Sequence, residues 1–190
     1  LLKARAANHT GSIETVPLDE LPAPEDDSPC LNDLHTISGL LSRRPHEFHK
    51  GKAGRVGIVA GSRGMLGAAV LCATGALRSG AGLVTLFTDE SIYAILAPML
   101  PPEVMVKPVK SLSAVMEERL DALALGPGIG SLWDDAEFFK LLANFQNPMV
   151  LDADALNRIA ADGVSKHLKA NMILTPHPGE MTRLYPESKG

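Results

Sequence analysis

Four short clusters of glycine, acidic and histidine residues are the parts of this sequence that could do chemistry. Glycines let backbone N–H groups approach a ligand closely, carboxylates can hold Mg²⁺ or accept a proton, and histidine can relay a proton. Each cluster directly follows a run of apolar residues. In chain order the clusters are residues 61–67 (GSRGMLG), 126–130 (GPGIG), 152–154 (DAD) and 175–180 (TPHPGE).

The first cluster joins an apolar run to a helix that we expect to begin near Leu66. Its glycines Gly61, Gly64 and Gly67 would let a pyrophosphate approach the N-terminus of that helix, where anions are favoured. The spacing G-x-x-G-x-x-G is neither the dinucleotide fingerprint G-x-G-x-x-G nor a phosphate-binding loop ending in G-K-[ST]. A ligand loop and a tight structural turn therefore both stay open. Asp89, at the end of the next run, could act as the ribose-binding acid of a dinucleotide-binding unit.

The second and third clusters offer backbone groups and carboxylates to a ligand. One glycine and one proline suffice for a turn, so the alternate Gly126, Gly128 and Gly130 favour a surface that a ligand approaches closely. Asp152 and Asp154 end an apolar run, where a carboxylate can hold a Mg²⁺-bound phosphate, act as a base or hydrogen-bond a ribose. For Asp154 the alternative is a capping role at the helix that follows.

The fourth cluster centres on His177, which is flanked by Pro176 and Pro178. The fixed φ angles of the prolines stiffen this histidine, so that beside Glu180 it can hydrogen-bond a ligand, relay a proton or position a metal-bound phosphate. We expect replacement of His177 by alanine to cost little stability, because the prolines would still shape the loop. No H-x-x-x-H or C-x-x-C spacing accompanies it, so a zinc site is not expected.

The elements that must position these clusters alternate between strand and helix. Near-continuous apolar runs suit strands buried on both faces of a parallel sheet. We predict strands at 55–60, 82–87, 103–106, 122–125, 148–151 and 171–174. We predict helices at 66–79, 90–98, 112–120, 134–144 and 153–161. Right-handed crossovers between such strands build a doubly wound, mostly parallel α/β sheet, and all four clusters then fall at its carboxyl edge, where ligands bind.

Composition and charge exclude several classes of protein. The 190 residues are 45% apolar and 21% charged, and 18 Lys and Arg against 22 Asp and Glu give a net charge of −4. Without a basic stripe interleaved with aromatic residues, nucleic-acid binding is disfavoured, and we predict no membrane span of ~20 apolar residues. The cysteines Cys30 and Cys72 make no disulfide framework, and Cys72 is typical of a small buried hydrophobe in a reducing, cytoplasmic compartment.

The chain divides near residue 45. Residues 1–45 are poor in periodicity and rich in Pro, Asp, Glu and Ser, which is typical of an extended linker or leader, with a weak helical pattern at 31–41. The regular alternation of strand and helix occupies residues 46–190.

Taken in order, the motifs resemble the NAD(P)HX dehydratase family, carbohydrate-kinase-related repair enzymes with a ribokinase-like fold. The resemblance covers about residues 43–185, and the occurrence of its motifs in the right order makes it specific. It rests on HKG at 49–51, GRV at 54–56 with the loop 61–69, ALRSGAGLV at 76–84, GPGIG at 126–130, LDADALN at 151–157 and TPHPGE at 175–180. The HKG stretch precedes a strand, so we assign it a structural role.

The resemblance implies an activity, which is the dehydration of (6S)-NADHX and NADPHX to NADH and NADPH at the expense of ADP, or of ATP in eukaryotic members. The ring hydroxyl is phosphorylated and phosphate then leaves by elimination. Such an enzyme must position two nucleotides and stabilise charge on a transferring phosphoryl group, usually with Mg²⁺. A homo-oligomer, specifically a tetramer, is also implied.

Roles for individual residues follow from the same resemblance. The damaged dinucleotide would contact Ala68, Gly128, Gly130 and His177. The nucleotide phosphates would lie near Gly64, Gly67, Asp152, Asn157 and Glu180. Among these, Asp152 and Glu180 would be the ligands of Mg²⁺.

One departure from the family pattern concerns the catalytic base. Related folds carry a G-S-G-D segment whose helix N-terminus forms an anion hole and whose Asp is the base, preceded by a Lys-Gly segment that contacts the adenine nucleotide, and neither occurs here. We therefore expect residues 46–190 to be the N-terminal portion of the dehydratase domain, with the catalytic Asp beyond residue 190. Residues 1–45 would be a leader or, alternatively, the tail of a preceding epimerase domain.

Two other functions stay open. A ribokinase-like kinase of a small vitamin alcohol would share the sheet and the glycine loops, and a non-catalytic nucleotide-binding module would need no anion hole. The TPHPGE cluster at 175–180 favours the dehydratase over the kinase.

Overall fold

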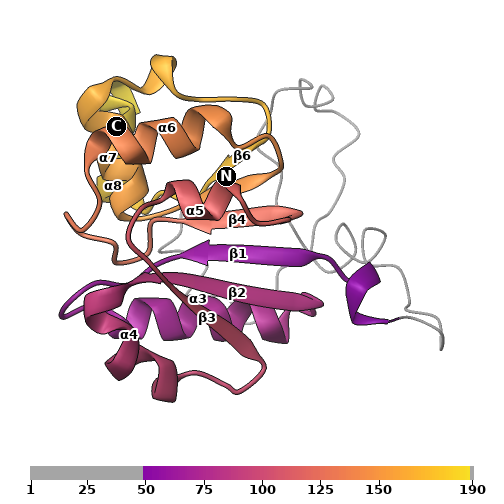
Figure 1. Ribbon diagram of the computed structural model, residues 1–190. Helices are drawn as coiled ribbons and strands as arrows, with labels where there is room; N and C mark the ends of the chain where they lie inside the picture. The colour runs from indigo at the N-terminus through magenta and orange to yellow at the C-terminus, as the bar shows by residue number, and fades with distance from the viewer. Residues whose placement is uncertain (1–48, 189–190) are drawn as a thin grey trace, which may run out of the picture. The chain divides into compact units, whose positions relative to one another are not determined.

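The computed structural model of the chain describes residues 49–188, which fold around one six-stranded sheet (Figure 1). The strands are β1 (Arg55–Val59), β2 (Leu83–Asp89), β3 (Val104–Val109), β4 (Ala122–Leu125), β5 (Met149–Leu151) and β6 (Met172–Leu174). The α-helices are α3 (Leu66–Arg78), α4 (Glu90–Leu96), α5 (Ser113–Met116), α6 (Asp135–Asn144), α7 (Asp154–Asp162) and α8 (Pro178–Leu184). Single 3₁₀ turns are η1 (Lys50–Lys52), η2 (Ala97–Met99), η3 (Val164–Lys166) and η4 (Pro186–Ser188).

Strands β1 and β4 lie side by side at the centre of the sheet. The strand order is β3-β2-β1-β4-β5-β6, and every pairing within this sheet is parallel. Val56 of β1 pairs with Val84 on one side and with Ala122 on the other. From β1 the chain moves outward to β2 and from β4 to β5, so the connections diverge between these two strands. The predicted doubly wound α/β sheet is confirmed, with parallel pairing throughout these six strands.

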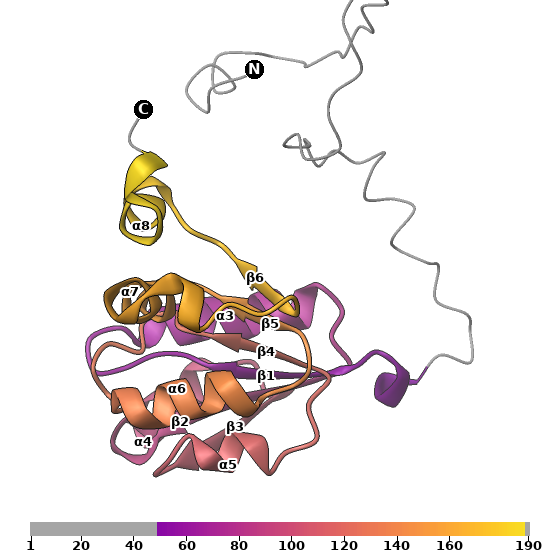
Figure 2. The ribbon, with the colours of Figure 1, turned by 90° about the horizontal axis from the view of Figure 1, so that it is seen from above.

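Alternate strand residues build two separate cores, one on each face of the sheet. Ile58 packs with residues of α3 and α4, whereas its neighbour Val59 packs with residues of α5, α6 and α7. Figure 2 shows α3 on one side of the strands and α5 and α6 on the other. Because the central strands are covered on both faces, they consist of nearly continuous apolar residues.

Small residues bring α3 close to the end of β1. Ala69 and Ala73 are fully buried, and a Cβ built at Gly61 would lie 2.8 Å from the Cβ of Ala69. The φ of Gly61 is +82°, a conformation that favours glycine. Glycine therefore allows the sharp exit from β1 that places the N-terminus of α3 at the carboxyl edge of the sheet.

The six predicted strands and the five predicted helices are all present, with two differences from prediction. Helix α5 ends at Met116 instead of residue 120, and the buried Leu120 lies in the connection between α5 and β4. Helix α8 was not predicted, since its first turn lies in the Pro-His-Pro-Gly stretch, which is typical of a loop. Within residues 49–188, none of the helices combines the length and apolar character that a membrane crossing needs. The predicted leader at 1–45, its weak helix at 31–41 and Cys30 lie outside the described residues.

We predict that the face covered by α6 carries a large part of the stability. Leu141 of α6 is fully buried, so Leu141→Ala should lower the free energy of unfolding by about 2–5 kcal/mol. Leu71 of α3 is 75% exposed, so the matched control Leu71→Ala should change it by less than about 0.5 kcal/mol. Urea denaturation of both variants measures the difference. Equal effects would contradict this assignment of the core.

Candidate functional site

The glycine clusters after β1 and β4 meet at the centre of the carboxyl edge. This is the topological switch point, where the crevice of an open parallel sheet binds ligands. The N–H of Gly61 donates to the carbonyl oxygen of Pro127 at 2.8 Å, which joins the two loops directly. A crevice of about 420 Å³ opens beside this junction, and its walls include Ser62, Met65 and Gly130.

The glycines of the second cluster are required by the backbone and by close packing. The φ angles of Gly126, Gly128 and Gly130 are +127°, +64° and +54°. A Cβ built at Gly126 would lie 2.0 Å from the carbonyl oxygen of Asp152, and one at Gly128 would lie 2.9 Å from the Cβ of Ala68. The packing of the loop between α3 and the β5–α7 connection thus accounts for glycine at these positions, and the ligand approach that the sequence favours stays a prediction.

The glycines of the first cluster are different, because nothing fills the space beside them. Gly64 and Gly67 are exposed, and a Cβ built at either would meet no atom within 4 Å. Gly64 has a φ of +86°, but Gly67 lies inside α3 without a positive φ. Glycine in a helix costs about 1 kcal/mol relative to alanine, so neither packing nor backbone geometry accounts for Gly67. Open space at this position suits the close approach of a ligand.

The N-terminus of α3 is an uncapped helix end beside this open space. Its N-cap residue Met65 makes no side-chain capping bond, and the first turn holds no acidic residue. The first N–H groups of a helix lack partners within the helix and carry a partial positive charge. An anion such as a phosphate would satisfy them. Ala68, one of the predicted contacts, lies in this first turn.

The connection from β5 to α7 carries the two aspartates and an unusual backbone. Ala153, between them, has φ +48° and ψ −115°, the only positive φ of a residue other than glycine among residues 49–188. The carboxylate of Asp154 accepts a hydrogen bond from the N–H of Gly130 at 2.9 Å. Asp154 is therefore neither free for a ligand through that oxygen nor a cap of α7, whose N-cap is Ala153.

Asp152 presents a carboxylate that makes no hydrogen bond to the rest of the described chain. Burial raises the pKa of the Cys72 thiol in α3, and the charge of Asp152 raises it further. Asp152 is the predicted metal ligand that is available for coordination.

The other predicted metal ligand, Glu180, is engaged within its own helix turn. Glu180 is buried, and its Oε2 accepts from the N–H of His177 at 2.9 Å. The N–H of Gly179 donates to His177 Nδ1 at 3.0 Å, which places the ring proton on Nε2, 3.2 Å from Glu180 Oε1. His177 and Glu180 thus form the capping box of α8.

The capping role of His177 corrects one expectation. Loss of an N-cap side chain costs about 1 kcal/mol. His177→Ala should therefore lower the stability of α8, even though the flanking prolines remain. Asn157 has a comparable local role, since its Oδ1 accepts from Arg183 Nε at 2.8 Å and ties α7 to α8. The structure therefore brings Gly64, Gly67, Ala68, Gly128 and Gly130 together, and it places His177, Glu180 and Asn157 in a second group on α7 and α8.

Asp89 has a structural role as well. Its carboxylate accepts from the N–H of Ser91 at 2.8 Å and caps α4. Among residues 49–188 no group of three or more His, Cys, Asp or Glu side chains could enclose a metal ion. A magnesium ion held by one or two carboxylates together with substrate phosphates needs no such group.

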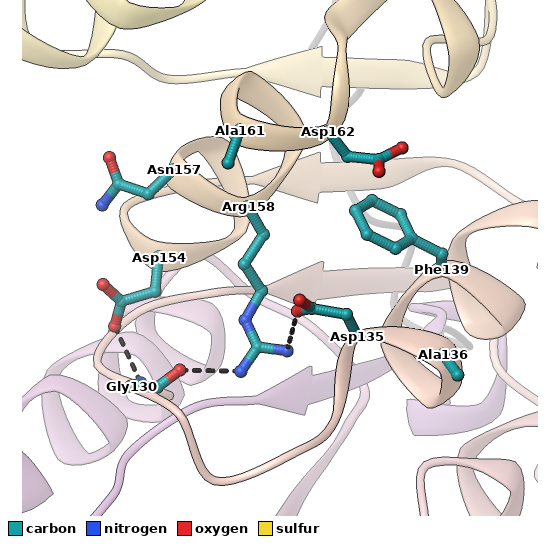
Figure 3. Close-up of a pocket in the computed structure, with 9 residues that line it drawn as sticks. All are labelled: Gly130, Asp135, Ala136, Phe139, Asp154, Asn157, Arg158, Ala161 and Asp162. Carbon is teal, nitrogen blue, oxygen red and sulfur yellow. Dashed lines mark hydrogen bonds and ion pairs between the residues drawn. The ribbon is translucent and has the colours of Figure 1, made fainter.

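Sequence reasoning missed Arg158, which lies beside the site. A groove of about 500 Å³ runs between α6 and α7, and Arg158 crosses it between Gly130 and Asp135 (Figure 3). Asp154 and Arg158 are four residues apart and so share one face of α7. That spacing, in a helix that begins at the carboxyl edge, is the signal that could have drawn attention to them.

A doubly wound parallel sheet with glycine loops at its switch point is typical of nucleotide-binding α/β proteins, and comparisons with known proteins identify the fold as ribokinase-like. A ribokinase-like superfamily protein of Enterococcus faecalis is 27% identical, with a TM-score of 0.65 over 75% of this chain and 52% of that one. The family model for NAD(P)H-hydrate dehydratase matches residues 56–190. The chain therefore belongs to the NAD(P)H-hydrate dehydratase family.

Individual relatives agree with this assignment. The bifunctional NAD(P)H-hydrate repair enzyme of Escherichia coli is 34% identical over 189 residues, which is 97% of this chain and 36% of that protein. The ADP-dependent (S)-NAD(P)H-hydrate dehydratase of Bacillus subtilis is 34% identical over 78% of this chain and 53% of that protein. A crystal structure of a Bacillus subtilis ADP/ATP-dependent NAD(P)H-hydrate dehydratase, co-crystallized with ATP/Mg²⁺, has a TM-score of 0.64 and 31% identity over 80% of this chain and 54% of that one. The chain thus spans about a third to a half of the length of these relatives.

We predict that Ala153 holds a strained backbone. A residue other than glycine in such a conformation costs about 1–3 kcal/mol. Glycine relieves this strain but also increases the entropy of the unfolded chain, so Ala153→Gly should raise the free energy of unfolding by a net amount of about 1 kcal/mol. The matched control Ala160→Gly, inside α7, should lower it by about 1 kcal/mol. Thermal or urea denaturation compares the two. A loss of stability in Ala153→Gly as large as in the control would contradict the strain.

Proposed function

We propose that the protein carrying this chain dehydrates (6S)-NADHX and NADPHX to NADH and NADPH, with ADP or ATP as phosphoryl donor and Mg²⁺ as metal. The observation that carries the proposal is the uncapped N-terminus of α3 beside the switch-point crevice, in a chain of this family. One Bacillus subtilis relative is named ADP-dependent (S)-NAD(P)H-hydrate dehydratase, and the solved structure of a Bacillus subtilis ADP/ATP-dependent NAD(P)H-hydrate dehydratase was co-crystallized with ATP/Mg²⁺. Phosphoryl transfer to the ring hydroxyl followed by loss of phosphate would give the product.

In this proposal the α3 end of the crevice binds phosphate. The N–H groups at the start of α3 donate to phosphate oxygens, and the open space at Gly64 and Gly67 lets those oxygens come close. Of the predicted dinucleotide contacts, Gly130 lines the crevice, and Gly128 packs against Ala68 and Met65 of the adjoining wall. Because these groups are fixed by packing before the ligand arrives, little ordering is needed on binding.

Asp152 is the better candidate for the metal of the two predicted ligands. Its carboxylate makes no hydrogen bond within residues 49–188, whereas both oxygens of Glu180 face His177. Carboxylate oxygen is a ligand that Mg²⁺ accepts, and substrate phosphates and water would complete the coordination. When bound, Mg²⁺ neutralises charge on the transferring phosphoryl group. Glu180 would then act by holding His177 in place.

We also propose the organisation of the whole protein. Residues 46–190 would be the front portion of the dehydratase domain, and residues 1–45 a leader or the tail of an epimerase domain. The greater length of the relatives supports this, as do the exposed Val150 and Ile173, paired on the sheet face away from α6 and α7. A tetrameric assembly and a cytoplasmic location complete the proposal, and analytical ultracentrifugation and cell fractionation test them.

The direct test of the reaction is an assay of the full-length protein with NADHX, ADP and Mg²⁺. Recovery of NADH absorbance that depends on ADP or ATP is the expected result. Phosphorylation of a small vitamin alcohol without recovery of NADH would identify a kinase instead. Nucleotide binding with no turnover of either compound would identify a non-catalytic module. Both of these outcomes would contradict the proposal.

A substitution at His177 separates its two roles. Asparagine is a good N-cap residue, so His177→Asn should keep the stability of α8 while removing the ring, which is 63% exposed. If the ring contacts the dinucleotide, turnover of NADHX should fall about tenfold, the effect of one lost hydrogen bond to the ligand. His177→Ala is the comparison, with similar turnover and lower stability. Wild-type turnover in His177→Asn would restrict this residue to capping.

A further inference from the structure

Gly130 is held at both of its backbone polar groups by side chains of α7. Its N–H donates to Asp154 Oδ2 at 2.9 Å, and its carbonyl oxygen accepts from Arg158 Nη2 at 2.8 Å. Figure 3 shows the two side chains reaching the same residue from successive turns of the helix. We call this arrangement of Asp154, Arg158 and Gly130 the α7 clamp. A glycine backbone has no side chain to fix it, so these two bonds determine where the end of the loop lies.

Arg158 is itself fixed in three ways. Its side chain is only 12% exposed, and its Nη1 lies 3.2 Å from Asp135 Oδ1 in an ion pair. The guanidinium carbon lies 5.2 Å from the ring centroid of Phe138, within the range of a cation–π contact. A buried, paired guanidinium has few alternative positions. Through the clamp, the positions of α6 and α7 determine where Gly130 lies at the end of the loop that follows β4.

The clamped residue forms a wall of the switch-point crevice. A Cβ built at Gly130 would lie 3.2 Å from both Ser62 Oγ and Met65 Cε, so Gly130 faces the loop that leads into α3. Ala153, which has a strained backbone, directly precedes Asp154, and the Asp154 carboxylate bonds to Gly130 instead of capping α7. Strained backbone is retained where the surrounding structure needs the geometry that it produces.

We propose that Asp154 and Arg158 are positioning residues, which hold the Gly130 wall of the crevice in the geometry that receives the dinucleotide. This inference rests on the proposed function and goes beyond it, because it assigns Asp154 a role in hydrogen bonding and none in proton transfer. The carboxylate accepts a bond from an amide that does not titrate. Replacing it by an uncharged acceptor should therefore preserve its effect, which an acid or base would not allow.

The test compares Asp154→Asn with Asp154→Ala in the full-length protein. Asparagine retains an oxygen that can accept from Gly130, whereas alanine does not. Misplacement of a binding wall typically costs up to about 100-fold in rate. Asp154→Ala should raise KM for NADHX about 10- to 100-fold and change kcat less, while Asp154→Asn stays within about threefold of wild type with the same pH profile. Asp162→Asn, in the same groove but paired with His167, is the matched control and should leave both constants unchanged.

Amide hydrogen exchange at Gly130 tests the clamp without any substrate. A hydrogen bond to a charged group protects an amide by about 10- to 100-fold, so exchange of this N–H should accelerate by that factor in Asp154→Ala and not in Asp162→Asn. Unchanged exchange in Asp154→Ala would overturn the clamp, whatever the protein's substrate. Asp154→Asn as inactive as Asp154→Ala, with one limb of the pH profile lost, would overturn the positioning role in favour of acid–base catalysis. Accelerated exchange in a protein that never turns over NADHX would support the clamp and contradict the proposed function.

Discussion

The loops that leave β1 and β4 meet so closely that Gly61 N–H donates to the carbonyl oxygen of Pro127 at 2.8 Å, and the arrangement of the site depends on this junction. A side chain at Gly61 or Gly128 would push against Ala69 or Ala68 of α3. With glycine at both positions, α3 begins directly at the crevice and its first N–H groups point to the carboxyl edge. Phosphate binding at a helix end is the chemical consequence of that packing.

The two faces of the junction are held differently. On the α3 side, contacts are made by small side chains and leave open space at Gly64 and Gly67. On the α7 side, the polar contacts of Asp154 and Arg158 close the loop down onto the helix. One side of the crevice is thus free to receive a ligand and the other is fixed in advance. Such preorganisation reduces the ordering that binding would otherwise require.

Hydrophobic patterning was sufficient to predict the strands, because β1 after Arg55 and the whole of β4 carry no polar side chain. It could not predict α8, which begins with Pro178 and Gly179 and whose capping box depends on a contact between His177 and Glu180. Residue type alone could not show that Gly128 packs closely against Ala68 and Met65, because that contact joins residues far apart in the sequence. The bond between Asp154 and Gly130 joins residues that are 24 positions apart, a contact that no periodicity encodes.

The central claim is that the start of α3 binds a phosphate of the ligand, and backbone amide NMR tests it most directly. Titration of the full-length protein with NADPH, and separately with ADP, reports the amides that each ligand touches. The account predicts that at least one of the two shifts the Gly64, Gly67 and Ala68 resonances strongly and at saturable concentration. Binding of both ligands with these three amides unmoved would contradict it.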